Sequence, residues 1–220
     1  MRAEELISEY IPPIKYTESG EKALNWMNEF RVNHLAVVDG KNYIGIVSDD
    51  DIYDMKDPKN SLKSELPYLQ NPFVYGDSHI YDVLKTIANA KITIVPVLNR
   101  NNEYIGCTDL LFLISQITAV SSMKEAGGVI VLEMNKHDYS LTQIARIVEE
   151  NDAKILSSYV SSLTDSTNVQ VTLKINSTEI DSILRTFERY DYFIKESYSE
   201  GEYFEDLKNR YDELMNYLKL

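Results

Sequence analysis

Ser48 and Asp51 are the residues whose types and spacing best suit binding chemistry. They stand three positions apart at the predicted start of a helix, a pattern like a capping box with aspartate in place of the usual glutamate. A helix start presents unpaired backbone N–H groups, and a serine hydroxyl and an ionised carboxylate add hydrogen-bonding groups for a polar ligand. The alternative is a plain N-cap, with Asp49, Asp50 and Asp51 on a solvated first turn.

The other chemically active residue types show no catalytic or metal-binding spacing. The three histidines are scattered, Cys107 is the one cysteine, and neither HExxH nor CxxC occurs. The sequence therefore predicts neither a zinc site nor a Cys/His nucleophile pair. His137 and Asp138 are interpreted as an exposed polar turn. We expect no enzyme activity, no catalytic residue and no metal.

The composition is that of a globular, soluble protein. The 220 residues are 44% hydrophobic and 26% charged, and no apolar run approaches the roughly 18 residues that a spanning helix needs. The 22 Lys and Arg against 35 Asp and Glu give a net charge of −13, which disfavours nucleic acid and anionic membranes as partners. The lone cysteine and the absence of a signal-peptide pattern predict a cytoplasmic protein.

A repeat organises the first half of the chain. Leu24 and Leu84 occupy the same place in two similar helical segments, 60 positions apart (84 − 24), and Gly45 and Gly106 follow at a separation of 61 (106 − 45). A one-residue insertion in the turn between two strands accounts for the difference. Each copy predicts the order helix, strand, strand, helix. We expect the two copies to dock sheet to sheet and to leave clefts at the seam.

The residues of this repeat resemble the cystathionine-β-synthase (CBS) domain, in the stretches Leu35-Ala36-Val37-Val38-Asp39 and Gly45-Ile46-Val47-Ser48-x-x-Asp51. The resemblance implies a tandem CBS pair over residues 1–125, each repeat β-α-β-β-α, with repeat 1 at about 1–60 and repeat 2 at about 61–125. It also implies an adenosine-containing nucleotide as the ligand.

The same resemblance implies roles for individual residues. Ser48 and Asp51 would hold phosphate and ribose, and the adenine pocket would be lined by Ile14, Lys15, His34 and Ala36. Ala36 replaces the proline that the family usually carries. The alternative for His34 is a half-exposed residue at a strand edge.

The charges around Ser48 predict which nucleotide is favoured. Asp49 and Asp50 already complement the helix dipole, so each further phosphate of a free ATP would be repelled. We therefore expect AMP, ADP or adenosine. In the second copy Asp109 stands at the position of Ser48 and Phe112 at that of Asp51, which predicts a degenerate second site and one functional site per chain.

Residues 126–200 predict a different domain with the order βαββαβ. Apolar residues alternate with polar ones along 169–175, as expected for a sheet with helices on one side. This ferredoxin-like order resembles an ACT domain, a fold that pairs side by side and binds amino acids. Its usual Pro-Gly is missing from the turn at 135–140, so we expect dimerisation rather than effector binding. A helix with an aromatic stripe is predicted for 201–220.

Together the halves resemble bacterial CBS–ACT proteins of the acetoin-utilisation type, with an α+β fold. The resemblance implies a non-catalytic sensor in which an adenine nucleotide, bound as a regulatory ligand and not as a cofactor, changes the arrangement of a homodimer. The alternative is a ligand-free scaffold in which both halves merely build a dimer.

Overall fold

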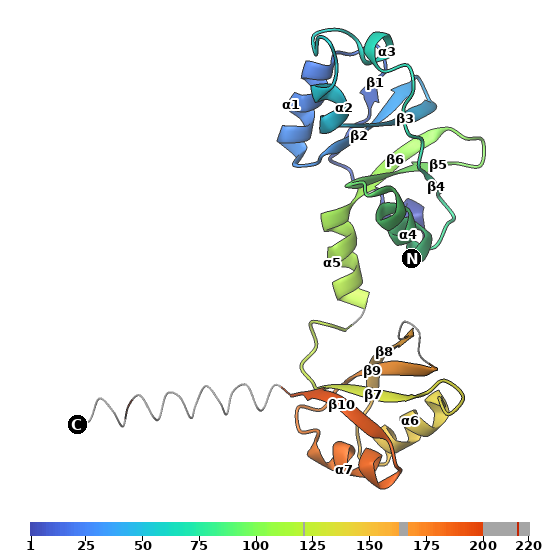
Figure 1. Cartoon of the computed structure of the whole chain (residues 1–220), viewed down its shortest axis with the longest axis vertical. Coiled ribbons are helices and arrows are strands. Elements are labelled where there is room, and N and C mark those ends of the chain that lie inside the picture. The colour runs from blue at the N-terminus through green and yellow to red at the C-terminus, as the bar shows by residue number, and fades with distance from the viewer. Residues whose placement is uncertain (121, 163–166, 200–214, 216–220) are drawn as a thin grey trace. The chain divides into compact units, whose positions relative to one another are not determined.

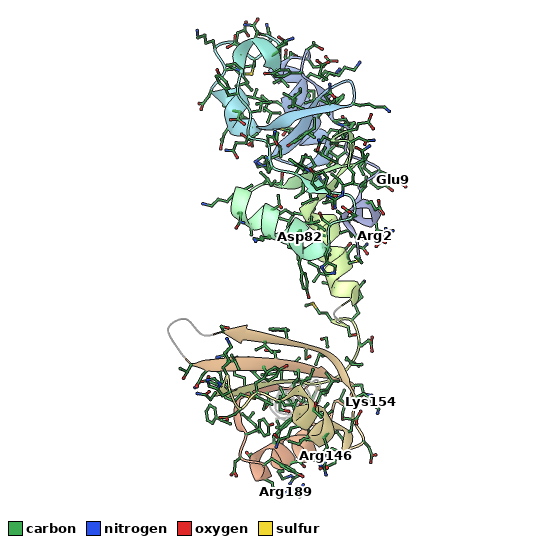
Figure 2. All side chains as sticks on the ribbon, turned by 90° about the vertical axis from the view of Figure 1, so that its right-hand side faces the viewer. Arg2, Glu9, Asp82, Arg146, Lys154 and Arg189 are labelled. Atoms are coloured by element: carbon green, nitrogen blue, oxygen red, sulfur yellow. The ribbon has the colours of Figure 1, made fainter. Side chains whose placement is uncertain are left out.

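The structure is a computed structural model that describes residues 1–120, 122–162, 167–199 and 215. The chain forms two compact units, Met1–Gln116 and Ile117–Leu220, and helix α5 (Leu110–Val120) crosses their division. The domain bounds expected from the sequence stay a prediction. The predicted C-terminal helix at 201–220 lies outside the described residues, except for Met215. Charged side chains such as Arg2, Asp82 and Lys154 are exposed on the surface (Figure 2).

The first unit contains two three-stranded sheets of identical topology (Figure 1). A short strand runs parallel to the central strand, and the third strand is antiparallel to it. Val37 pairs with Gly45 in one sheet and Val97 with Gly106 in the other, and a bulge follows each pair. The first sheet is β1 (Ile14–Lys15), β2 (His34–Asp39) and β3 (Asn42–Ser48), and the second is β4 (Val74–Tyr75), β5 (Ile94–Leu98) and β6 (Tyr104–Asp109).

The helices repeat with the strands. Helix α1 (Gly20–Phe30) joins β1 to β2, and α4 (Ile80–Ala90) joins β4 to β5; their N-caps are Ser19 and His79. Helix α2 (Asp49–Tyr53) follows β3, as α5 follows β6. Each copy therefore has the order β-α-β-β-α, which confirms the duplicated unit that the sequence predicted.

The two copies are interlocked by the segments that precede them. The 3₁₀ helix η1 (Ala3–Leu6) lies against the second sheet, where the N–H of Ala3 donates to Ser78 O at 2.8 Å. Helix α3 (Leu62–Glu65) lies against the first copy, where the N–H of Leu62 donates to Glu18 O at 2.8 Å. The beginning of each copy thus packs on the other copy.

The repeated glycines make room for these crossings. A Cβ atom at Gly45 would lie 2.6 Å from Gln70 O, and one at Gly106 would collide with the side chain of Ile7. The close approach at Gly45 brings Gln70 O to the N–H of Ile46, which donates to it at 2.8 Å. The tyrosine-isoleucine-glycine pattern of the repeat therefore serves packing between the copies.

The second unit is an antiparallel sheet with the strand order β10-β7-β9-β8 and both helices on one side (Figure 1). Val169, Val171, Leu173 and Ile175 are buried, and the residues between them are half-buried, so the predicted alternation is confirmed. The elements are β7 (Val129–Asn135), α6 (Leu141–Glu149), β8 (Ile155–Ser162), β9 (Asn168–Ile175), α7 (Asp181–Arg189) and β10 (Phe193–Tyr198).

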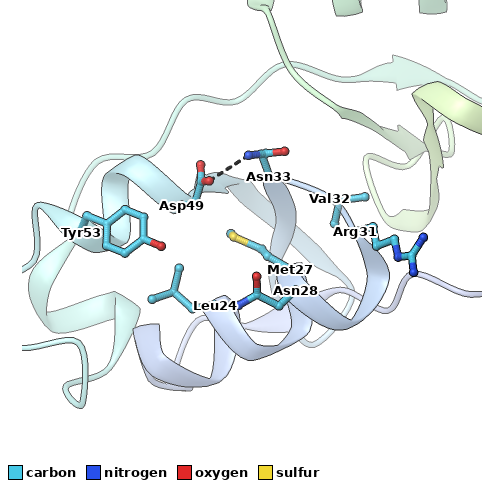
Figure 3. Close-up of a pocket in the computed structure, with 8 residues that line it drawn as sticks. All are labelled: Leu24, Met27, Asn28, Arg31, Val32, Asn33, Asp49 and Tyr53. Atoms are coloured by element: carbon cyan, nitrogen blue, oxygen red, sulfur yellow. Dashed lines mark hydrogen bonds between the residues drawn. The ribbon is translucent and has the colours of Figure 1, made fainter.

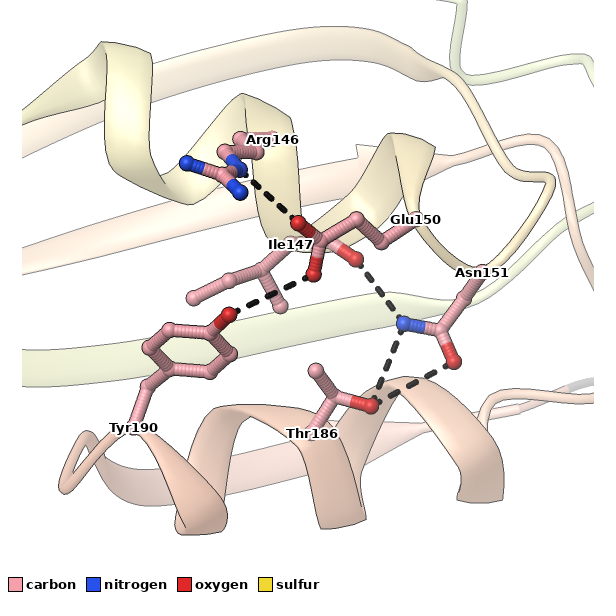
Figure 4. A network of polar contacts seen from close by, with 6 residues as sticks. All are labelled: Arg146, Ile147, Glu150, Asn151, Thr186 and Tyr190. Atoms are coloured by element: carbon pink, nitrogen blue, oxygen red, sulfur yellow. Dashed lines mark hydrogen bonds and ion pairs between the residues drawn. The ribbon is translucent and has the colours of Figure 1, made fainter.

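A polar network joins the end of α6 to α7 and the turn after it (Figure 4). Glu150 accepts from Arg146 Nε at 2.8 Å and from Tyr190 Oη at 3.5 Å, while Asn151 Nδ2 donates to Thr186 Oγ1 at 3.2 Å. These bonds satisfy polar groups at the rim of an apolar layer between helices and sheet, so they fix how α6 and α7 lie on the sheet.

The described elements of the two units form an α+β fold. The second unit has the βαββαβ order that the sequence predicted.

Candidate functional site

Ser48 and Asp51 form the capping box that the sequence predicted. The N–H of Asp51 donates to Ser48 Oγ at 3.0 Å, and Asp51 Oδ2 accepts from the N–H of Ser48 at 2.8 Å and from its hydroxyl at 2.7 Å. Both side chains are half-buried. In the part of the chain that the structure describes, Oδ1 of Asp51 has no hydrogen-bond partner, so one carboxylate oxygen is left to accept bonds from a ligand.

The rest of the first helical turn is acidic. Asn33 holds Asp49 from two sides, because its Nδ2 donates to Asp49 Oδ2 at 2.8 Å and its carbonyl accepts from the N–H of Asp49 at 3.0 Å. Asp50 is exposed. Three carboxylates therefore lie within one turn, and α2 is only five residues long, so its dipole offsets little of their charge.

His34 lies directly opposite Ser48 in the antiparallel pairing of β2 with β3. Its Nδ1 accepts from the N–H of Thr93 at 3.3 Å and lies 3.1 Å from the hydroxyl of the same residue, which belongs to the second copy. Burial lowers the pKa of His34, and the charges of Asp49, Asp51 and Asp50 oppose that effect. The half-buried His34 thus joins the candidate site to the other copy.

The remaining predicted residues lie on the same sheet but differ in exposure. Ala36 is two positions along β2 from His34 and hence on the same face, and it is 1% exposed. Lys15 is exposed, whereas the Ile14 side chain is 0% exposed. The structure therefore brings His34 and Ser48 together with Asp51 and places Ile14 in the core. That all six residues bind a ligand stays a prediction.

A cavity of about 290 Å³ opens beside α2, between this helix and α1 (Figure 3). Of the acidic turn only Asp49 reaches it, and none of the six predicted residues lines it. The sequence patterns did not indicate this cavity; the apolar residues Leu24 and Met27 in the predicted helix are the signal that could have done so. The lining residues are Leu24, Met27, Asn28, Arg31, Val32, Asn33, Asp49 and Tyr53.

The other end of the seam between the copies is aromatic and was also missed. Tyr43 and Tyr104 stack with their ring centroids 6.4 Å apart, and the hydroxyl of Tyr43 donates to Pro72 O at 2.8 Å. Burial raises the pKa of both tyrosines, and it raises the pKa of the neighbouring Cys107 thiol to about 11. This end of the seam is therefore packed with aromatic side chains.

The second copy differs from the first at the corresponding helix start. Asp109 stands where Ser48 does, and its Oδ1 accepts from the N–H of Phe112 at 2.9 Å. Leu110 and Leu111 take the places of Asp49 and Asp50. The cap is kept, but the carboxylate that would contact a ligand is replaced by an aromatic ring.

The second unit has a cavity of about 330 Å³ beside the turn at 135–140, where the missing Pro-Gly predicted dimerisation rather than effector binding. It is lined by Glu133, Met134, Asn135, Asp138, Gln143, Tyr190, Asp191, Tyr192 and Phe193. Among the described residues, no group of three or more His, Cys, Asp or Glu side chains is placed to hold a metal ion. No helix in the described ranges is both long and apolar enough to span a membrane.

Comparisons with known proteins match the first copy to a family. The family model of the CBS domain matches residues 3–56. A search of curated proteins finds no match.

Three solved structures illustrate the similarity of fold, and each has low sequence identity to this chain. A CBS domain pair/ACT domain protein from Thermotoga maritima is 18% identical, with 54% of this chain and 98% of that chain covered and a TM-score of 0.49. CBSX2, solved in complex with AMP, is 17% identical over 54% and 97%, with a TM-score of 0.47. AcuB from Vibrio cholerae, a candidate acetoin utilization protein, is 15% identical over 56% and 95%, with a TM-score of 0.49.

The family match and the topology agree on the first unit. The matched residues contain the hairpin and the Ser48-x-x-Asp51 stretch from which the resemblance was inferred, and the second copy repeats the same strand order and register. Residues 3–56 match the CBS domain, and the second copy repeats the topology of the matched copy.

Proposed function

We propose that this protein is a non-catalytic regulator that binds an adenosine-containing nucleotide at Ser48, Asp51 and His34. The observation that carries the proposal is the hydroxyl–carboxylate pair at the start of α2, opposite His34, within residues that match the CBS domain. Lys15 and Ala36 extend the site along the sheet, and Ile14 supports it from the core. CBSX2, a structure of similar fold, contains AMP.

The ribose is the part of the ligand that suits Asp51. Its Oδ2 is engaged by the capping bonds, and its Oδ1 is available. A carboxylate oxygen accepts strong, charge-assisted bonds from hydroxyl groups. The same carboxylate also caps α2. Ligand binding would therefore change the hydrogen bonds at the start of this helix.

The charge of the site favours a ligand with few phosphates. Asp49, Asp50 and Asp51 lie in a single turn of a helix whose dipole is small, so each added phosphate meets more repulsion than attraction. Among the predicted site residues, Lys15 carries a positive charge, and its side chain is exposed. AMP, ADP and adenosine are therefore favoured over free ATP.

Regulation requires that the ligand bind one arrangement of the protein better than another. Differential affinities of this kind typically amount to about 1 to 3 kcal/mol. The proposed arrangement is that of a homodimer in the cytoplasm. In the rival function both units build a dimer and the site stays without a ligand.

Calorimetric titration with AMP, ADP, ATP, adenosine and S-adenosylmethionine tests the proposal. We expect one AMP or ADP per chain in the wild type. Asp51→Asn, which keeps an acceptor oxygen but removes the charge, should weaken binding by about 10-fold or more. Asp54→Asn at the exposed C-cap of the same helix is the matched control and should bind normally. Absence of heat with every ligand would contradict the proposal and favour the alternative function, a ligand-free scaffold.

The dimer is tested separately by sedimentation with and without AMP. A dimer whose sedimentation coefficient changes on AMP binding would support the regulatory role. A monomer under both conditions would contradict the dimeric part of the proposal without affecting the nucleotide site.

A further inference from the structure

Thr93 offers two hydrogen-bond donors to one ring nitrogen of His34. Its backbone N–H lies 3.3 Å from His34 Nδ1, and its hydroxyl oxygen lies 3.1 Å from the same atom. The N–H of Asn33 donates to that hydroxyl oxygen at 3.1 Å. The threonine oxygen therefore accepts one bond from Asn33, and its own proton is free to point toward His34.

These contacts determine which ring nitrogen carries the proton. A backbone N–H is always a donor, so the Nδ1 atom that accepts from it cannot hold a proton itself. Neutral imidazole has one proton, which must then be on Nε2. The tautomer of His34 is thus set by a residue of the other copy.

The proton on Nε2 is available to a ligand. Nε2 has no hydrogen-bond partner in the ranges that the structure describes, although the side chain is half-buried. His34 faces Ser48 across the strand pair, and the charges of Asp49, Asp50 and Asp51 act on its ring. A phosphate oxygen at this point would lie among three carboxylates, whereas an uncharged acceptor would not be repelled.

We propose that Thr93 is a positioning residue that holds His34 as an Nε2–H donor to an unprotonated ring nitrogen of the adenine base. The inference rests on the proposed nucleotide function and names the base-recognition contact of that site. It means that the site in the first copy is complete only when the second copy is docked against it.

The tautomer is measured without any ligand by the ¹⁵N chemical shifts of the histidine ring. We expect an unprotonated Nδ1 and a protonated Nε2 for His34 in the full-length wild type. Thr93→Val keeps the backbone N–H and removes only the hydroxyl donor, so Nδ1 of His34 should stay unprotonated while its ¹⁵N shift moves. Thr86→Val is the matched control, because its hydroxyl donates to Asp82 O within α4. A protonated Nδ1 in the wild type would overturn the inference, as would unchanged shifts in Thr93→Val.

The ligand contact is measured with AMP analogues in which one ring nitrogen is replaced by carbon. We expect at least one of the 1-, 3- and 7-deaza analogues to bind the wild type about 3- to 10-fold more weakly than AMP. In His34→Phe this difference should disappear, and in His34→Gln, which can present an N–H near the position of Nε2, it should be partly restored.

The outcomes separate the two proposals. Equal binding of AMP and all three analogues by the wild type, or an unchanged difference in His34→Phe, would overturn the contact while leaving the nucleotide function intact. Absence of AMP binding by the wild type would overturn the nucleotide function and the base contact together, and the ¹⁵N shifts would still decide the role of Thr93.

Discussion

Asp109 accepts a hydrogen bond from the backbone N–H of Phe112 at 2.9 Å. This bond is the counterpart of the one from Asp51 to Ser48 in the first copy, at 3.0 Å. Phe112 cannot return a bond to the N-cap as Asp51 does, because its side chain has no acceptor. Duplication has therefore preserved the helix cap in both copies and the hydroxyl–carboxylate pair in one.

Asp109→Ala should lower the free energy of unfolding by about 1 kcal/mol, because α5 loses its N-cap acceptor. Binding of one nucleotide per chain should remain. Urea unfolding and calorimetry measure the two effects, and Asp109→Asn, which keeps an acceptor oxygen, should restore the stability. Loss of the nucleotide in Asp109→Ala would contradict the assignment of the site to the first copy.

Gly45→Ala should destabilise the protein more than Gly40→Ala. The added methyl at position 45 would lie 2.6 Å from Gln70 O, so the segment containing Gln70 must move. This movement should lower the free energy of unfolding by about 3 kcal/mol. At Gly40, where φ is 63° and no atom lies within 4 Å, only backbone strain of about 1 kcal/mol is expected. Denaturant midpoints at constant m value give the comparison. Equal losses of stability in the two variants would show that the segment at Gln70 moves away from the added methyl at little cost.

The stability of the protein should fall as the pH drops below about 6.5, the ordinary pKa of histidine. Burial lowers the pKa of His34 in the folded protein, so the unfolded chain binds more protons in the interval between the two pKa values. Stability therefore rises with pH through that interval and is lost on acidification. His34→Phe should have a smaller slope of unfolding free energy against pH there. An unchanged slope would show that His34 titrates normally.

The thiol of Cys107 should be unreactive in the folded protein. The residue is 0% exposed and its pKa is raised to about 11 by burial, so roughly one thiol in a thousand is ionised at pH 8. We expect no reaction with a disulfide reagent such as DTNB under native conditions and complete reaction in urea. The carbonyl of Ile11 accepts a hydrogen bond from the Cys107 Sγ atom. Rapid stoichiometric labelling of the native protein would mean that the segment containing Ile11 opens readily and exposes the thiol.

Local patterns were sufficient to predict the elements of both units. Helical and alternating periodicities are properties of short stretches, so the helix, strand, strand, helix order of each copy and the alternation along β9 could be predicted without knowledge of the rest of the chain. The short first strand of each copy was implied only by the family resemblance. The capping box at Ser48 was predictable for the same reason, because its partners are three residues apart.

Contacts between residues distant in sequence could not be predicted in this way. Nothing in a short stretch indicates that the segment before each copy packs on the other copy. The reason for the glycine at position 45 became clear only from its distance to Gln70. The stacking of Tyr43 on Tyr104 likewise depends on how the two sheets dock.

The sequence alone determined that the chain carries a duplicated unit, that one copy has a hydroxyl and a carboxylate at a helix start, and that the second half is a different fold. Only the tertiary structure decided that these two groups bond to each other and that the backbone N–H of Thr93 donates to His34. The physical reason is that periodicity and capping depend on neighbours along the chain, whereas a tautomer and a close backbone approach depend on atoms that only folding brings together.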